Sequence, residues 1–183
     1  ADDVMCSILA ENNVPKTAFF IPAIDAGADF HLRWFTPTME VDPCGHATLA
    51  SAFVLVNELA QQSEPLRFTA ASGLLSACLR NDGMITLDLL VLPGHEMDVP
   101  EGLESAIGHH VVNFRRALMN MAVLQDESAV CGGKPDLSYI RHLEGDVLII
   151  TSAEDSRDCV SRYFAPNSGI DEEPVTGSAH CTI

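Results

Sequence analysis

Two short segments of the chain place acidic, thiol, imidazole and hydroxyl groups beside a glycine that can begin a helix. The first segment, residues 42–47, reads Asp-Pro-Cys-Gly-His-Ala, and the second, residues 173–179, reads Glu-Pro-Val-Thr-Gly-Ser-Ala. Each follows a run of the form Arg–aromatic–Phe–small–Pro, at residues 33–37 and 162–166. Two matches that occur in the same order along the chain indicate a duplicated structural unit.

The shared pattern predicts a strand, a tight turn, and a helix whose first turn carries unpaired backbone N–H groups. Such a helix start attracts anions, because the free N–H groups and the helix dipole both stabilise negative charge. Two helix starts that face one cleft would bind a small carboxylate, with Gly45, Gly177 and Ser178 as the contacting residues. Either segment taken alone could instead be a structural connection between a strand and a helix.

Two side chains of the first segment could move protons. His46 lies at the start of the predicted helix, where the dipole disfavours the charged imidazole and leaves a neutral ring able to exchange a proton. It could equally serve as a capping or hydrogen-bonding histidine. Cys44 directly precedes the helix, and a thiol at such a position ionises more readily. Its alternative role is that of a small residue packed in a turn.

These segments resemble the PhzF-like family of phenazine-biosynthesis isomerases, in particular the eukaryotic branch that includes the MAWD-binding protein. The matching text lies at residues 32–37, 44–52, 161–166 and 173–181. The resemblance implies an α+β fold of two pseudo-symmetric, barrel-like mixed-sheet domains, each around a central helix, as in diaminopimelate epimerase. We expect these domains at residues 1–108 and 109–183. Because family members are longer at both ends, the second domain is expected to be incomplete. The chain would then be a fragment, a truncated product, or a sequence that needs help to complete its second barrel.

The resemblance also implies proton transfer without a metal or an organic cofactor. The family's catalytic glutamate lies in a Leu-Ser-Glu-Thr-Ala-Phe-like stretch, and this chain reads Val-Pro-Lys-Thr-Ala-Phe at residues 14–19, so Lys16 replaces the glutamate. An exposed lysine is already protonated at neutral pH and could accept a proton only if burial removed its charge. Lys16 could otherwise be a surface or anion-pairing residue. Glu173 occupies the place of a family aspartate, and its extra methylene moves the carboxylate by about 1 Å.

Three functions remain open. The first is a PhzF-like isomerase or epimerase acting on a small carboxylate, in which Glu173 and His46 handle protons and Cys44 assists. The second is a binding or scaffolding protein that Lys16 has left catalytically impaired. The third is an amino-acid racemase with Cys44 and Glu173 as opposed bases, because a cysteine at this place moves the α-proton in related epimerases and racemases.

Hydrophobic periodicity and turn residues predict the elements that would position these groups. The helix at 46–60 is apolar on every side, so we expect other elements to enclose it. A hairpin turn is expected at residues 81–83, and Gly108 is expected to end a helix. The other expected helices are 2–12, 100–107, 126–130, 136–143 and one from Ser178 onward; the expected strands are 17–22, 28–36, 66–70, 73–80, 84–90, 111–118, 121–125, 147–151 and 158–165.

Composition excludes several classes of function. The 183 residues include 10 Lys+Arg and 26 Asp+Glu, a formal charge of −16, which disfavours nucleic acid and anionic membrane surfaces as partners. No apolar stretch approaches the roughly 20 residues that cross a bilayer, and the acidic N-terminus lacks the basic start of a signal peptide. The six cysteines are widely spaced and form no Cys-x-x-Cys pair, which favours a reducing, cytoplasmic location.

The sequence predicts neither a metal site nor a nucleotide site. His109 and His110 are adjacent and would point apart in a strand, and the His-Cys pair at 180–181 lacks partners at ligand spacing. There is no Walker-type phosphate loop and no Gly-x-Ser-x-Gly elbow of a hydrolase. We therefore expect no cofactor. We also expect a homodimer, because an incomplete second barrel favours association or segment exchange.

Overall fold

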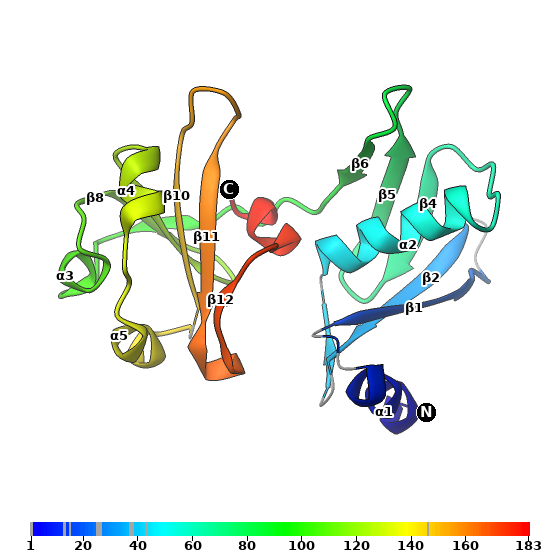
Figure 1. Ribbon diagram of the computed structural model, residues 1–183, viewed down its shortest axis with the longest axis horizontal. Helices are drawn as coiled ribbons and strands as arrows, with labels where there is room; N and C mark the ends of the chain where they lie inside the picture. Colours follow the sequence, from blue (N-terminus) through cyan, green and yellow to red (C-terminus); the bar gives the residue numbers. More distant parts are fainter. Residues whose placement is uncertain are drawn as a thin grey trace. The chain divides into compact units, whose positions relative to one another are not determined.

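The computed structural model describes residues 2–12, 14, 16–24, 27–36, 39–42, 44–145 and 147–183. The chain divides into two compact units, residues 1–90 and 91–183, and each has its own mixed six-stranded sheet (Figure 1). This is the α+β class expected from the sequence. Pro15 and Pro37, which the sequence predicts to end the helix at 2–12 and the strand at 28–36, lie outside the described residues, as does Pro43.

The first sheet has the strand order β1-β2-β4-β5-β6, and β3 also pairs with β2. β2 and β4 run parallel, with α2 in the connection between them, whereas the other neighbouring strands are antiparallel. The elements of this unit are α1 (Asp2–Asn12), β1 (Thr17–Pro22), β2 (Phe30–Phe35), β3 (Glu40–Val41), α2 (Gly45–Asn57), β4 (Leu66–Ala70), β5 (Gly73–Leu79) and β6 (Ile85–Asp88).

Helix α2 packs on this sheet with one face only. Its residues Ala47, Ala52 and Leu55 are buried in a core that includes residues of β2, β4 and β5. On its other side Leu49 is 39% exposed and Phe53 is 53% exposed. The expectation that other elements enclose this helix is therefore wrong for the described residues, because a single sheet covers a single side of it.

The second sheet has the order β12-β11-β10-β9-β8-β7. β9 and β10 run parallel, with α4 and α5 in the connection, and the other neighbours are antiparallel. The elements are β7 (His95–Met97), α3 (Leu103–Ile107), β8 (Val111–Arg116), β9 (Asn120–Leu124), α4 (Glu127–Gly132), α5 (Leu137–His142), β10 (Leu148–Ser152), β11 (Val160–Ala165), β12 (Ile170–Glu173) and the 3₁₀ helices η1 (Pro166–Ser168) and η2 (Gly177–Cys181).

Strand β10 is buried on both faces, which explains its continuous apolar sequence. Leu148 and Ile150 belong to the larger core, together with residues of α3, α4 and α5. Ile149 points the other way, into a smaller cluster with Met121 and Ala179. The segment that contains η2 is thus packed against the second face of this sheet.

The helix ends in the second unit follow from local side-chain chemistry. The carboxylate of Asp126 caps α4 by accepting a hydrogen bond from the Ala129 N–H at 2.9 Å, and Asp136 caps α5 by accepting one from the Ser138 N–H at 2.8 Å. Gly108 ends α3 with φ +80°, a left-handed conformation that favours glycine. These ends confirm the expected positions of the three helices.

Three further features differ from the expectations. The division between the units lies before β7, whereas the sequence placed it after Gly108; β7 pairs with β8, and α3 contributes to the second core. The short strands β3, β7 and β12 were not expected, and the segment from Gly177 forms a 3₁₀ helix. Among the residues that the structure describes, no helix is long and apolar enough to cross a membrane.

Candidate active site

We call residues 42–47 and 173–179 the first and second signature segments. The first follows β3, and the chain between β2 and β3 is fixed by hydrogen bonds of Thr36 with Met39. The Thr36 N–H donates to the Met39 carbonyl at 2.8 Å, and the Thr36 hydroxyl donates to the same oxygen at 3.0 Å. β3 then pairs with β2 through Trp34 and Val41. The next residue, Asp42, accepts a hydrogen bond of 2.7 Å from the Ser72 hydroxyl through its carboxylate. This bond fixes the residue that follows β3.

Cys44, Gly45 and His46 form the start of α2. Cys44 is the N-cap residue with extended backbone (φ −135°, ψ 96°), and its carbonyl accepts from the Thr48 N–H at 3.1 Å and from the Thr48 hydroxyl at 2.8 Å. The Cys44 side chain is buried, with its Sγ 3.9 Å from Nε2 of His46. The structure thus places the thiol and the imidazole in contact at a helix start, a contact that the sequence had not predicted.

Lys16 directly precedes β1 and is half-buried. Thr17, the next residue, pairs with Phe35 at the end of β2. Lys16 therefore lies beside the end of β2 that leads into the first signature turn. α2 also packs against β1.

Glu173 is the last residue of β12 and faces Tyr163 of β11 in the antiparallel ladder. Tyr163 packs against the smaller core cluster, and its burial, followed by the charge of Glu173, raises the pKa of its hydroxyl to about 12. The phenol is therefore neutral at physiological pH and remains a hydrogen-bond donor. Glu173 is half-buried, so the carboxylate begins the second signature segment partly shielded from water.

Gly177 and Ser178 begin η2, and Thr176 is its N-cap residue, with φ −121° and ψ 89°. Ala179 is buried, and the Cys181 carbonyl accepts a hydrogen bond of 2.7 Å from the Leu92 N–H. The Thr176 hydroxyl oxygen is buried and has no hydrogen-bond partner among the described residues. The second signature segment is thus anchored at its far end.

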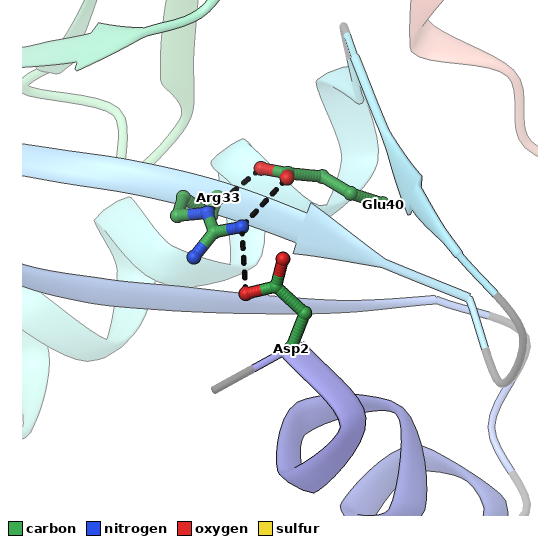
Figure 2. A network of polar contacts seen from close by, with 3 residues as sticks. All are labelled: Asp2, Arg33 and Glu40. Carbon is green, nitrogen blue, oxygen red and sulfur yellow. Dashed lines mark hydrogen bonds and ion pairs between the residues drawn. The ribbon is translucent and has the colours of Figure 1, made fainter.

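Two matching ion pairs brace the hairpins that lead into the signature segments. Arg33 of β2 donates through Nε and Nη2 to the two carboxylate oxygens of Glu40, at 2.8 and 2.7 Å (Figure 2). Arg162 of β11 donates through the same two nitrogens to Glu172, at 2.7 and 2.8 Å. Each guanidinium also lies over the ring of the phenylalanine two positions later, 4.9 Å from the Phe35 centroid and 5.1 Å from the Phe164 centroid.

The sequence analysis did not predict these ion pairs. The arginine that begins each of the two repeated runs was the feature that could have indicated them. Glu40 and Glu172 lie outside the runs, and their roles become visible only once the hairpins are formed. The two pairs now give the correspondence between the segments. Glu40 precedes Gly45 by the same number of residues as Glu172 precedes Gly177.

By this correspondence, Thr176 occupies the position of Cys44, and Glu173 that of Val41. The N-cap dihedral angles of Cys44 and Thr176 agree closely, and the pairing of Tyr163 with Glu173 matches that of Trp34 with Val41. The sequence had instead matched the two acid–proline pairs. That alignment made Glu173 the counterpart of Asp42, and the racemase alternative separately paired Glu173 with Cys44 as opposed bases. Counted from the ion pairs, the counterpart of Cys44 is instead Thr176.

Within the described parts of the chain, no three His, Cys, Asp or Glu side chains are grouped so that they could hold a metal ion. The groups that the two segments present are instead backbone N–H groups, hydroxyls, a thiol, an imidazole and a carboxylate. Such groups can bind a small anion and exchange protons with it.

The family model of the phenazine biosynthesis-like proteins (PhzC-PhzF) matches residues 1–183, and the chain belongs to this family. An uncharacterized isomerase of Pseudomonas aeruginosa is 37% identical to it over 182 residues, which cover 100% of this chain and 69% of the relative. The human phenazine biosynthesis-like domain-containing protein is 35% identical over 207 residues, which cover 100% of this chain and 72% of the relative. The eukaryotic relatives expected from the sequence are therefore confirmed.

Solved structures agree with this assignment. A PhzF-family protein from Enterococcus faecalis superposes with a TM-score of 0.87 at 38% identity, covering 100% of this chain and 69% of that chain. A hydroxyproline epimerase from Agrobacterium vitis, solved with bound trans-4-hydroxy-L-proline, gives a TM-score of 0.55 at 13% identity over 82% of this chain and 53% of that chain. The second likeness concerns the fold alone, which is of the epimerase type expected from the sequence.

Proposed function

We propose that this protein is a proton-transfer isomerase or epimerase that acts on a small carboxylate without a cofactor. The observation that carries the proposal is the matched pair of signature segments, each following a braced hairpin and each opening a helical turn after an extended N-cap residue. Membership of a family whose relatives include proteins named as isomerases supports the same class of reaction.

In this proposal the substrate carboxylate binds to the backbone N–H groups of Gly45 and Gly177 and to the hydroxyl of Ser178. Exposed N–H groups at helical starts stabilise a carboxylate. Glu173 accepts the substrate proton as a carboxylate, and His46 returns a proton at the new position. Cys44, with its Sγ 3.9 Å from the His46 ring, assists by exchanging a proton with the imidazole.

A second candidate is a binding or scaffolding protein with little catalysis. It is favoured by Lys16, which stands in the stretch where the family's isomerase carries its glutamate. A cation at this position would pair with a bound anion but would not remove a proton. A racemase that uses Cys44 and Glu173 is the third candidate. It is disfavoured because the residue equivalent to Cys44 in the second unit is Thr176 and not Glu173, so the two proposed bases do not occupy equivalent positions.

The test is incorporation of solvent deuterium. Small carboxylates, including α-amino acids, cyclic imino acids and unsaturated cyclic hydroxy acids, are incubated in D₂O with the wild-type protein, and mass spectrometry and NMR locate any new C–D bond. Cyclic imino acids are included because the epimerase that shares the fold was solved with one. We expect exchange that Glu173→Gln reduces by a factor of about 10² to 10⁴, the usual contribution of a general base.

The variants separate the three candidates. An isomerase incorporates solvent deuterium at a position other than the one that lost its proton, and an epimerase incorporates it at the same carbon; in both, Cys44→Ser retains most of the rate. A racemase places deuterium on the original carbon and loses its exchange in Cys44→Ser. Binding of a carboxylate, detected by calorimetry, without exchange in wild type would identify a binding protein. Unchanged exchange in Glu173→Gln would show that Glu173 is not the base.

A further inference from the structure

The two units carry the same side-chain arrangement at the same place in the fold. In each, an arginine on the strand before the signature segment holds the carboxylate of a glutamate on the next strand in a side-on, two-bond geometry, and stacks over a phenylalanine. Arg33 and Glu40 form the pair in the first unit, and Arg162 and Glu172 form it in the second. A side-on arginine–carboxylate pair fixes direction as well as distance, because both N–H···O bonds must be satisfied together.

The strands that these pairs fasten have few other restraints. β3 is only two residues long and lies at the edge of the path from β2 to α2. β12 is the edge strand of the second sheet, and its pairing with β11 is irregular between Tyr163 and Ala165. A short or irregular edge strand has little ladder hydrogen bonding, so a two-bond ion pair adds a directional restraint that the ladder does not supply.

Each arginine also ties the hairpin to a neighbouring helix. Arg33 reaches Asp2 at the start of α1, with Nη2 3.1 Å from the carboxylate (Figure 2). Arg162 donates from Nη1 to the carbonyls of Val130 and Gly133, at 3.0 and 2.7 Å, where α4 ends. The strand that precedes each signature segment is therefore attached to a helix of its own unit. Glu172 adjoins Glu173, and Glu40 precedes Cys44 by four residues.

We infer that Arg33–Glu40 and Arg162–Glu172 are matched positioning pairs. The second pair sets the place of the Glu173 carboxylate, and the first sets the place of the Cys44–His46 segment. This inference rests on the proposed function for its catalytic consequence. The structural part of the inference is that these pairs fix the positions of β12 and β3. This part can be tested even if the protein shows no enzymatic activity.

The experiment replaces one carboxylate at a time by its amide. Glu172→Gln keeps the shape of the side chain and leaves the carbonyl contacts of Arg162 in place, so the unit is expected to fold. The control on the same strand is Asp171→Asn, which removes the exposed pair of Asp171 with Arg141 at 3.5 Å. In the first unit Glu40→Gln is matched by Asp82→Asn, which removes the surface pair of Arg80 with Asp82 at 2.7 Å.

The first measurement is amide hydrogen exchange. We expect Glu172→Gln to raise exchange in residues 170–177 and Glu40→Gln to raise it in residues 39–46, with the remainder of each unit unchanged. The two controls are expected to leave these segments protected. If exchange in these segments is the same in each glutamine variant as in its control, or rises evenly through the whole unit, the inference is overturned.

The second measurement is the kinetics of deuterium incorporation. Displacement of a reacting group by about 1 Å can cost up to about 10² in rate, so kcat is expected to fall by roughly 10- to 100-fold while KM changes little. Arg162→Gln also removes the bonds to the Val130 and Gly133 carbonyls, so the double variant should lose more than Glu172→Gln alone but less than the sum of the two single effects, because the two side chains share one interaction. Wild-type protein with no exchange on any substrate would defeat the proposed function, whereas the amide-exchange result would still decide the placement.

Discussion

Tyr163 lies directly opposite Glu173 in the ladder of β11 and β12, so a buried phenol and the proposed proton acceptor are cross-strand neighbours. Burial, and then the charge of Glu173, raises the pKa of the Tyr163 hydroxyl to about 12. A phenolate at this position would face a carboxylate with little water to separate the charges. The neutral phenol is therefore the form that the fold maintains.

The first prediction concerns alkaline stability. Because the pKa of Tyr163 is raised in the folded state, its contribution to stability is present below pH 10 and is lost as the pH rises from about 10 to 12. We expect a loss of about 1 to 2 kcal/mol over this range, allowing for partial solvent screening. Urea denaturation of wild type and Tyr163→Phe at several pH values measures it, and the variant should lack this part of the loss.

A spectrophotometric titration provides the control. The chain contains two tyrosines, and burial also raises the pKa of Tyr139. Ionisation followed at 295 nm should show both residues titrating above the usual value, with Tyr163 last. If Tyr163→Phe instead removes the component that titrates first, the assignment of the raised pKa is refuted.

The second prediction concerns Lys16. Lys16→Glu restores a carboxylate in the stretch Val-Pro-Lys-Thr-Ala-Phe, and a carboxylate can accept a proton at neutral pH where a protonated lysine does not. We expect the variant to increase deuterium incorporation by at least about tenfold. Lys16→Gln, which removes the cation without adding a base, is the control and should give no increase. Equal rates in all three proteins would mean that residue 16 is remote from the reaction.

The third prediction concerns Asn120, a fully buried amide at the start of β9. Its Nδ2 donates to the carbonyls of Glu144 and Val147, at 2.7 and 2.9 Å, and its Oδ1 accepts from Nε of Arg116 at 2.8 Å. Asn120→Asp would turn a donor that faces two carbonyls into an acceptor. We expect the free energy of unfolding to fall by about 2 to 4 kcal/mol, measured by urea denaturation.

The control for Asn120→Asp is Asn57→Ala, a substitution of an exposed asparagine. Asn57 is exposed, and its amide donates to the Phe53 carbonyl at 3.0 Å within α2. Its removal should change the unfolding free energy by less than about 0.5 kcal/mol. Similar effects of the two substitutions would show that the buried amide does not hold β9 and β10 in register.

The fourth prediction concerns acid. Hydrogen bonds from Arg33 and Arg162 lower the pKa of Glu40 and of Glu172, respectively. A lowered carboxyl pKa contributes stability that is complete above the ordinary value near 4.5 and is lost as the pH falls through the lowered pKa. Each pair is partly exposed, so we expect a contribution of about 0.2 to 1 kcal/mol.

This contribution is measured as a difference between proteins. The unfolding free energy of wild type should fall more steeply between pH 6 and pH 3 than that of Glu40→Gln or Glu172→Gln. Addition of 1 M NaCl should reduce the difference, because salt screens partly exposed ion pairs. Parallel pH profiles for wild type and both variants would refute the prediction.

The sequence was sufficient for the elements with strong periodicity. The alternation in residues 28–36 and the apolar run at 147–151 predicted β2 and β10, and the aspartates at 126 and 136 marked the starts of α4 and α5. The internal repeat predicted two related units. These signals are local, because each depends on residues that lie close together along the chain.

The remaining features depend on contacts between distant residues. β3 and β12 are too short, or too polar, to show a period, and they exist because β2 and β11 offer them an edge. The correspondence of Cys44 with Thr176 was hidden because Glu40 follows Arg33 by 7 positions whereas Glu172 follows Arg162 by 10, and because both segments contain an acid–proline pair. The exposed side of α2 was missed because composition reports apolar content and not the number of layers that cover it.

Every strand that the structure describes pairs only within its own unit, and each parallel pairing is closed by helices of that same unit. The most slowly formed contacts of a sheet are those between strands far apart in sequence. Here such contacts, as between Phe30 and Phe68 or between Asn120 and Leu148, are completed before the chain leaves the unit that contains them. The strand pairings described in each unit can therefore form without any pairing to the described strands of the other unit.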